Sequence, residues 1–231
     1  DASFVGSIDN VSVKEVGQDW TLSSGTSITA LGARITHTPT AGTAGQGALV
    51  IGQNYKFTYE ITESISGSLK INSAVDTSMV TSVGTHTKYF KADGATFSLS
   101  RTNSTSNDVT ITNISLEEVG QEWILSDGSS ITAQGARILS DGTYQDIAQA
   151  NALVIGDTYE MEYEITESIS GNLSVEGSFG SAIVLKDTVG VHKFYGVAIG
   201  TELQIKRTNS PVDATIDNIK VKRLNGDDTP R

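Results

Sequence analysis

Three glutamates alternate along one stretch of the chain and form its most suggestive arrangement for catalysis. Glu160, Glu162 and Glu164 stand two residues apart, and in an extended strand this spacing places successive carboxylates on one face, about 7 Å apart. Glycoside hydrolysis uses two carboxyl groups about 5–10 Å apart. The chain contains an earlier stretch of similar sequence, which does not keep the three carboxylates. We therefore expect a solvated sheet face rather than a catalytic pair. The matching residues are Lys56, Thr58 and Glu60.

Other catalytic chemistries have less support in the sequence. The chain consists of two parts with similar sequences, and His86 and His192 stand at matching positions, one in each part. A zinc site needs three or four converging ligands. The chain has no cysteine, which excludes disulfides, thiolate catalysis and cysteine-ligated zinc. It also lacks the Gly-x-Ser-x-Gly segment that carries the nucleophilic serine of many hydrolases. We expect a protein that is not an enzyme, with no catalytic residues.

Candidate ligand-binding residues lie where the two matching parts of the chain differ most. Before the segment Ala152 to Ile155, the second part has an aromatic residue flanked by carboxylates, whereas the first part has a run rich in glycine and alanine. An aromatic face with polar neighbours suits a sugar ring and its hydroxyl groups. Turn chemistry alone also accounts for an Asp-Gly pair, and both interpretations stay open. The glycan-binding hypothesis names Asp141, Tyr144 and Asp146.

The charge of the chain excludes several kinds of partner. Its 231 residues include 27 acidic and 16 basic ones, which gives a formal net charge of −11. Nucleic-acid binding needs clustered Lys and Arg that neutralise phosphates, and an acidic surface is equally unsuited to anionic membranes. No apolar run approaches the ~18 residues of a membrane span. We expect neither nucleic acid nor membrane insertion.

One short segment occurs three times and defines the organisation of the chain. The segment Ile8–Val16 returns at 111–119 and again at 216–224, about one hundred residues apart each time. In every copy, two apolar residues stand three apart before normal alternation resumes, as in Ile216, Ile219 and Val221. Inward-facing residues of a strand recur every second position, so a jump of three predicts a bend or bulge.

Short strands separated by turn residues predict an all-β fold. In the second repeat Tyr159, Met161, Tyr163 and Ile165 alternate with polar residues, which is typical of a strand with one buried face. We expect two tandem jelly-roll β-sandwich domains preceded by an orphan closing strand. Trp20 and Trp123 open the repeats, and we expect buried anchors there rather than sugar platforms. The expected boundaries are 1–16 for the orphan strand, 17–119 for repeat 1, 120–224 for repeat 2 and 225–231 for a tail. We expect no flexible linker between the repeats, which favours a stiff array.

These motifs together resemble known modules. A Trp near the start, a Gly-x-x-Tyr-x-x-x-Tyr strand, a Val-Gly-x-His segment and a terminal Ile-Asp-Asn-Val-Ser-Val are similar to jelly-roll carbohydrate-binding modules. The amino-acid sequence of the final strand is similar to repeats of phage virion proteins, especially tail-fibre and head-decoration proteins. The resemblance implies a virion structural or adhesive module, located on the virion surface or outside the cell, with weak glycan binding as a candidate property.

The same resemblance implies a candidate structural calcium. Carbohydrate-binding modules of this kind often hold calcium near the aspartate of the closing strand, and Asp9 and Asp217 occupy that position. The middle copy has Thr112 there, so the expected calcium concerns the other two copies. No other cofactor is expected.

Two functions follow as alternatives from the sequence. The first is a non-enzymatic structural and adhesive module of a virion fibre or decoration protein, acting as a stiff tandem spacer. The second is a carbohydrate-binding module carried by a secreted enzyme or cell-surface protein. Both complete repeats have their own closing strand, so residues 1–16 are expected to pair with a preceding repeat or with another copy of the chain through Ile8, Val11 and Val13. Residues before Asp1 are expected for the same reason.

Overall fold

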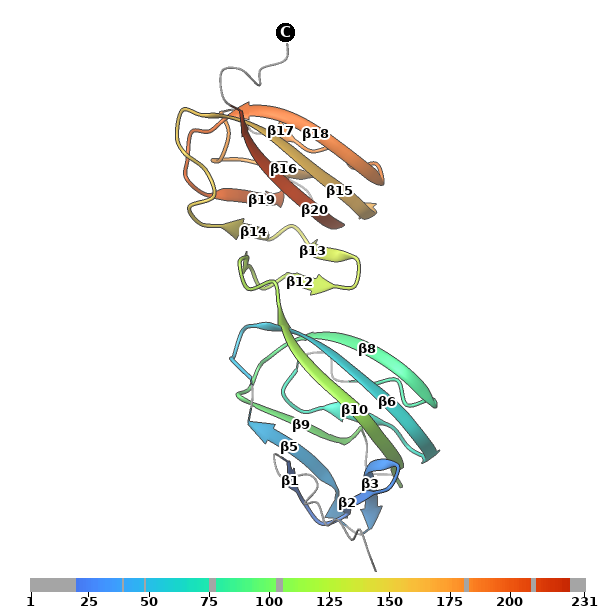
Figure 1. Ribbon diagram of the computed structural model, residues 1–231. Coiled ribbons are helices and arrows are strands. Elements are labelled where there is room, and N and C mark those ends of the chain that lie inside the picture. Colours follow the sequence, from blue (N-terminus) through green and yellow to red (C-terminus); the bar gives the residue numbers. More distant parts are fainter. Residues whose placement is uncertain are drawn as a thin grey trace, which may run out of the picture. The chain divides into compact units, whose positions relative to one another are not determined.

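The protein consists of strands and connecting loops (Figure 1). A computed structural model describes residues 20–38, 40–47, 49–74, 78–102, 106–180, 183–208 and 211–224. Within these ranges there is no helix, and hence none that is long and apolar enough to cross a membrane. The predicted all-β class is confirmed. The expected orphan strand and the C-terminal tail lie outside the described residues.

Repeat 1 forms two antiparallel sheets. One has the order β1-β5-β9-β7, and the other has the order β2-β3-β10-β6-β8 with the short β4 paired to β3. The strands are β1 (Thr21–Leu22), β2 (Thr26–Thr29), β3 (Gly32–Thr38), β4 (Thr40–Ala41), β5 (Thr43–Gly47), β6 (Asn54–Ser66), β7 (Leu69–Ile71), β8 (Gly84–Lys91), β9 (Thr96–Arg101) and β10 (Asp108–Val119).

Repeat 2 follows the same plan with its own two sheets. Their orders are β11-β14-β19-β16-β17 and β12-β13-β20-β15-β18, so each sheet draws its strands from one repeat. This is the organisation of β-sandwich domains; their assignment as jelly rolls stays a prediction. The strands are β11 (Ile124–Leu125), β12 (Ser129–Thr132), β13 (Gly135–Ser140), β14 (Asp146–Gln149), β15 (Thr158–Ser170), β16 (Leu173–Val175), β17 (Ile183–Val184), β18 (Gly190–Val197), β19 (Leu203–Arg207) and β20 (Val212–Leu224).

The long strand β15 carries the predicted alternation into the core. Its four apolar residues are at most 5% exposed, and the glutamates between them lie on the outer face. The hydroxyl groups of the buried tyrosines reach the backbone at the rim: the N–H of Val154 donates to Tyr159 (2.9 Å) and the N–H of Lys186 to Tyr163 (2.8 Å). A buried tyrosine needs such a partner. The buried residues are Tyr159, Met161, Tyr163 and Ile165, and those of β6 are Tyr55, Phe57, Tyr59 and Ile61.

The predicted kink of the closing strand is a β-bulge. Lys220 lies opposite Glu162 and Asp217 opposite Glu164, so two residues of β20 fall across from one residue of β15. Asn218 in this bulge has a left-handed φ of 50°, and Asn113 of β10 has a φ of 48°. Asparagine tolerates this conformation better than most residues. The spacing of the apolar residues therefore predicted the irregularity correctly.

Both bulge asparagines make the same side-chain contact. The Nδ2 of Asn218 donates to Oε2 of Glu164 at 2.7 Å, and the Nδ2 of Asn113 donates to Oε2 of Glu60 at 2.6 Å. Glycine at the start of the neighbouring strand permits the close approach: a Cβ on Gly135 would lie 2.5 Å from the carbonyl oxygen of Ile216. The bulge is thus fixed from two sides.

Replacing Tyr163 with alanine should lower the free energy of unfolding of repeat 2 by about 3–5 kcal/mol, because a buried ring is lost and a cavity is left. Glu162→Ala should have a much smaller effect, since solvent screens its ion pairs on the outer face. Denaturant titration followed by circular dichroism measures both. An effect of Glu162→Ala as large as that of Tyr163→Ala would show that the inward and outward faces are misassigned.

Asn218→Val should destabilise repeat 2 by about 1–3 kcal/mol, because a β-branched residue is strained in the left-handed conformation. Asn218→Gly is the matched control: it loses the same bond to Glu164 but adopts this φ without strain. Thermal melts of the two variants compare them directly. Equal destabilisation by valine and glycine would mean that the backbone conformation is not what the asparagine supplies.

Candidate functional site

The predicted glycan-binding residues lie in and beside the loop between β13 and β14. The side chain of Asp141 accepts the N–H of Thr143 at 3.0 Å, which closes a turn at the loop tip. This hydrogen bond is the main reason why the pKa of Asp141 is lower than usual. Asp141 therefore shapes the loop, as the turn interpretation proposed, and it remains exposed.

Tyr144 and Asp146 are brought together by this loop. The Tyr144 hydroxyl donates to Oδ2 of Asp146 at 3.2 Å, and the Tyr144 residue is 52% exposed. Oδ2 of Asp146 also accepts Nε2 of Gln204 at 2.7 Å. The backbone N–H of Asp146 donates to Oγ of Ser126 at 2.8 Å. The half-exposed ring is thus held beside a carboxylate that Gln204 of β19 also binds, on a residue whose backbone is fixed by Ser126.

The sequence did not identify the partners of Tyr144 on β19 and directly after β16. The Lys206 ammonium lies 5.6 Å from the centre of the Tyr144 ring, and its Nζ is 2.5 Å from Oε2 of Glu176. A cation over an aromatic face is attracted to it electrostatically. Together these side chains border a shallow hollow of about 190 Å³. Its lining consists of Tyr144, Ser174, Glu176, Val184, Lys206, Arg207 and Thr208.

The surroundings keep the Tyr144 hydroxyl protonated. Partial burial, followed by the negative charges of Asp146, Glu202 and Glu176, raises its pKa to about 12. A neutral phenol donates one hydrogen bond, which here goes to Asp146. The hollow therefore offers an aromatic face, a donor in Lys206 and a carboxylate acceptor in Glu176.

The described residues of repeat 1 that match the surroundings of Tyr144 differ in type. Ser100 pairs with Thr43 as Lys206 pairs with Asp146, so serine occupies the lysine position. The Ser100 hydroxyl donates to Oδ1 of Asn72 at 2.7 Å, and Nδ2 of Asn72 donates to Oγ of Ser98 at 2.9 Å. Ala41 stands two residues before Thr43, as Tyr144 stands two before Asp146. These positions of repeat 1 carry neither an aromatic ring nor a charge.

The glutamates of β15 form ion pairs on the outer face of the other sheet. Lys193 Nζ lies 3.0 Å from Glu160 and 2.9 Å from Glu162, and Lys220 Nζ lies 2.8 Å from Glu162. The hydroxyl of Tyr195 donates to Glu160 at 2.7 Å. Hydrogen bonds from Lys220 and Lys193 lower the pKa of Glu162 to about 2. A general acid needs a raised pKa, so this arrangement favours the expected solvated face.

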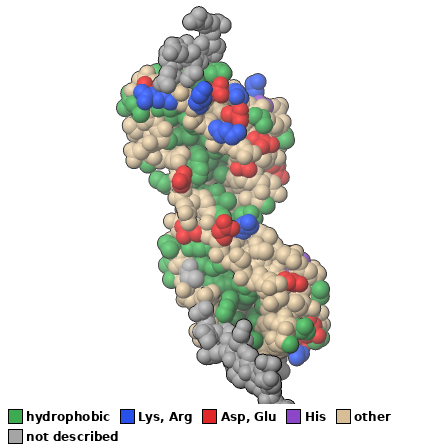
Figure 2. Space-filling view, viewed as in Figure 1, with side chains coloured by type: hydrophobic (Ala, Val, Ile, Leu, Met, Phe, Trp, Pro, Cys, Tyr) green, Lys and Arg blue, Asp and Glu red, His purple; other side chains and the backbone are tan. Residues whose placement is uncertain are grey.

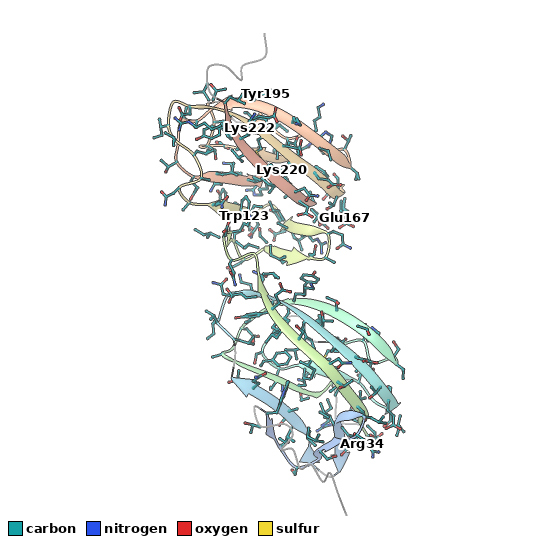
Figure 3. The ribbon with its side chains drawn as sticks, viewed as in Figure 1. Arg34, Trp123, Glu167, Tyr195, Lys220 and Lys222 are labelled. Carbon is teal, nitrogen blue, oxygen red and sulfur yellow. The ribbon has the colours of Figure 1, made fainter. Side chains whose placement is uncertain are left out.

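Charged side chains of both signs are visible together on this face of repeat 2 (Figure 2). Tyr195, Lys220 and Lys222 belong to the cluster and project from β18 and β20 (Figure 3). Lys222 lies directly opposite Glu160 in the strand register. In repeat 1 the corresponding pair has reversed signs: Lys56 Nζ lies 3.6 Å from Glu117. Retention of a pair with exchanged charges indicates cross-strand stabilisation rather than a ligand site.

His86 and His192 occupy equivalent structural positions in the two repeats. His86 Nε2 lies 2.7 Å from the carbonyl oxygen of Ser82, and His192 Nε2 lies 2.6 Å from that of Thr188. Each ring packs 5.5 Å from a tyrosine of the long strand. In the described ranges no three His, Asp or Glu side chains are grouped closely enough to hold a metal ion. The calcium expected near Asp217 stays a prediction, and Asp9 lies outside the described residues.

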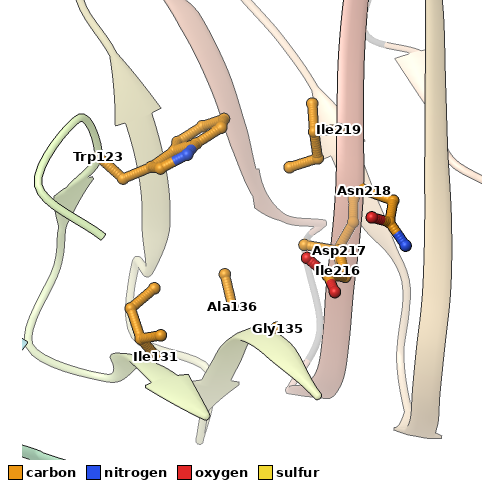
Figure 4. A pocket seen from close by; sticks show the side chains of 8 residues that line it. All are labelled: Trp123, Ile131, Gly135, Ala136, Ile216, Asp217, Asn218 and Ile219. Carbon is orange, nitrogen blue, oxygen red and sulfur yellow. The ribbon is translucent and has the colours of Figure 1, made fainter. Parts of the chain in front are cut away.

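A second hollow lies beside the bulge in both repeats. In repeat 2 it measures about 350 Å³ and is lined by Trp123, apolar side chains and the bulge itself (Figure 4). In repeat 1 its counterpart beside Trp20 measures about 290 Å³. Both tryptophans are half-buried, and the Trp20 ring meets Phe97 edge-on at 6.1 Å. The lining residues are identical in type except that Thr112 in repeat 1 corresponds to Asp217 in repeat 2. The hollow thus belongs to the structure that the repeats share.

Comparisons with known proteins found similarity among solved structures. No protein-family model matches the chain, and no curated protein matches it either. A solved structure with some similarity is the secreted serine protease VesC from Vibrio cholerae, with 12% sequence identity and a TM-score of 0.32. That match covers 86% of this chain and 51% of the VesC chain, so the chain spans about half the length of this neighbour.

Proposed function

We propose that this chain is a non-enzymatic structural and adhesive module in which repeat 2 carries a glycan-binding site around Tyr144. The observation that supports it most is the contrast between the two repeats. The buried strands, the bulge and the hollow beside the tryptophan are shared. Lys206 and Glu176 beside Tyr144 are replaced by Ser100 and Asn72 in repeat 1, where the lysine of this sheet, Lys70, stands at the position of Ser174. Loops on a conserved frame are where binding residues are usually found.

The proposed setting is a virion fibre or decoration protein on the virion surface. It rests on the resemblance of the closing strand to phage virion repeats, and it includes pairing of residues 1–16 with a preceding repeat or a second copy. A carbohydrate-binding module of a secreted enzyme or cell-surface protein is the alternative setting. The Tyr144 site serves adhesion in either case.

Tyr144→Ala should reduce binding on a glycan array about tenfold or more, because the ring is the main apolar surface of the hollow and tenfold corresponds to about 1.4 kcal/mol. Tyr195→Ala is the matched control, since Tyr195 has the same 52% exposure but lies on the other sheet. It should leave binding unchanged. Glycan binding that survives Tyr144→Ala, or that both variants abolish equally, would place the site elsewhere.

A further inference from the structure

Carboxylates outnumber cations around the Tyr144 hollow. Glu176 lines it, Asp146 bonds to the tyrosine hydroxyl, and Glu202 is close enough to raise the pKa of that hydroxyl. The two cations that line the hollow are Lys206 and Arg207. The Lys206 ammonium is already neutralised by Glu176 at 2.5 Å. Arg207 donates from Nη1 to the carbonyl oxygen of Thr208 at 2.8 Å.

The Lys206 ammonium is therefore poorly placed to receive an anionic ligand. A ligand carboxylate or sulfate that approached Lys206 would have to displace Glu176, and it would then lie close to Asp146 and Glu202. Like charges placed together in a partly desolvated site repel each other strongly. Such a repulsive element is a common source of specificity.

The same side chains suit a ligand that carries hydroxyl groups. Lys206 and Glu176 present a donor and an acceptor side by side, and Gln204 and Asp146 do the same 2.7 Å apart. Neighbouring hydroxyls of a sugar ring can accept from one partner and donate to the other. Hydrogen bonds to charged groups are stronger than neutral ones, so an uncharged ligand still gains binding energy here.

We propose, on the basis of the glycan-binding role proposed above, that the Tyr144 hollow selects neutral saccharides and excludes acidic ones. The sugar ring lies against Tyr144, and two pairs of side chains bind its hydroxyls. Glu176 has two roles: it accepts a ligand hydroxyl, and it prevents Lys206 from attracting uronates, sialates or sulfated sugars.

The test is an array of matched saccharides that differ in one carboxylate. It carries oligoglucosides with oligoglucuronides, oligogalactosides with oligogalacturonides, and oligomannosides with oligomannuronides, probed at low and at physiological salt. The protein should bind a neutral member at least tenfold better than its acidic partner, and the preference should be larger at low salt because screening is weaker. Acidic members bound as well as neutral ones would overturn the inference while leaving the glycan-binding role intact.

Glu176→Gln tests the mechanism of exclusion. It frees the Lys206 ammonium and should reduce the preference for neutral over acidic saccharides severalfold. Glu167→Gln makes the same change in net charge at an exposed position of the other sheet, and it should leave the preference as in the unmodified protein. An unchanged preference in Glu176→Gln would overturn the role given to Glu176. Absence of binding to every saccharide would overturn the proposed function, and this inference with it.

Discussion

The asparagine in the closing strand has a left-handed backbone conformation, and this is the constraint on which each repeat depends. In β20 this residue is Asn218, and it lies in a bulge where two residues stand opposite one residue of β15. The bulge separates two segments of strand pairing. Before the bulge, the strand pairs with both β13 and β15; after it, pairing continues with β15. The turn of the backbone at Asn218 is also what opens the hollow beside Trp123, because β13 begins at Gly135, directly against the bulge. The same geometry around Asn113 gives repeat 1 its equivalent hollow.

The bulge does not constrain the outer surface of the other sheet of repeat 2, so the side chains there can vary. Its strands β14, β19 and β16 carry Asp146, Lys206 and Ser174, while Tyr144 and Glu176 lie just beyond strand ends. Apart from Ser174, which is buried, these side chains lie outside the core, which consists of the inward residues of the two sheets. Substitutions on this outer surface change recognition at little cost in stability. In repeat 1, Ser100, Asn72 and Ser98 form an uncharged hydrogen-bond network at the matching positions.

Much of the fold could be predicted because it depends on local periodicity. The alternation of Tyr159 to Ile165 indicated the buried face, and the three-residue step from Ile216 to Ile219 indicated the bulge. The candidate site could be predicted only in part. Tyr144 and Asp146 are neighbours in sequence, whereas Lys206 and Glu176 join them through the pairing of β14 with β19 and of β19 with β16. Strand register across a sheet is not readable from one sequence, so the cationic and acidic partners were missed.

The two repeats share one arrangement of strands, and we propose that repeat 2 alone binds saccharide. Backbone amide NMR of the whole chain, titrated with the best neutral oligosaccharide from the array, tests it residue by residue. We expect shifts confined to three segments of repeat 2, residues 141–146, 174–176 and 204–208, with repeat 1 unchanged. Shifts centred on the hollows beside Trp20 and Trp123, or equal shifts at residues 72, 98 and 100 of repeat 1, would contradict it.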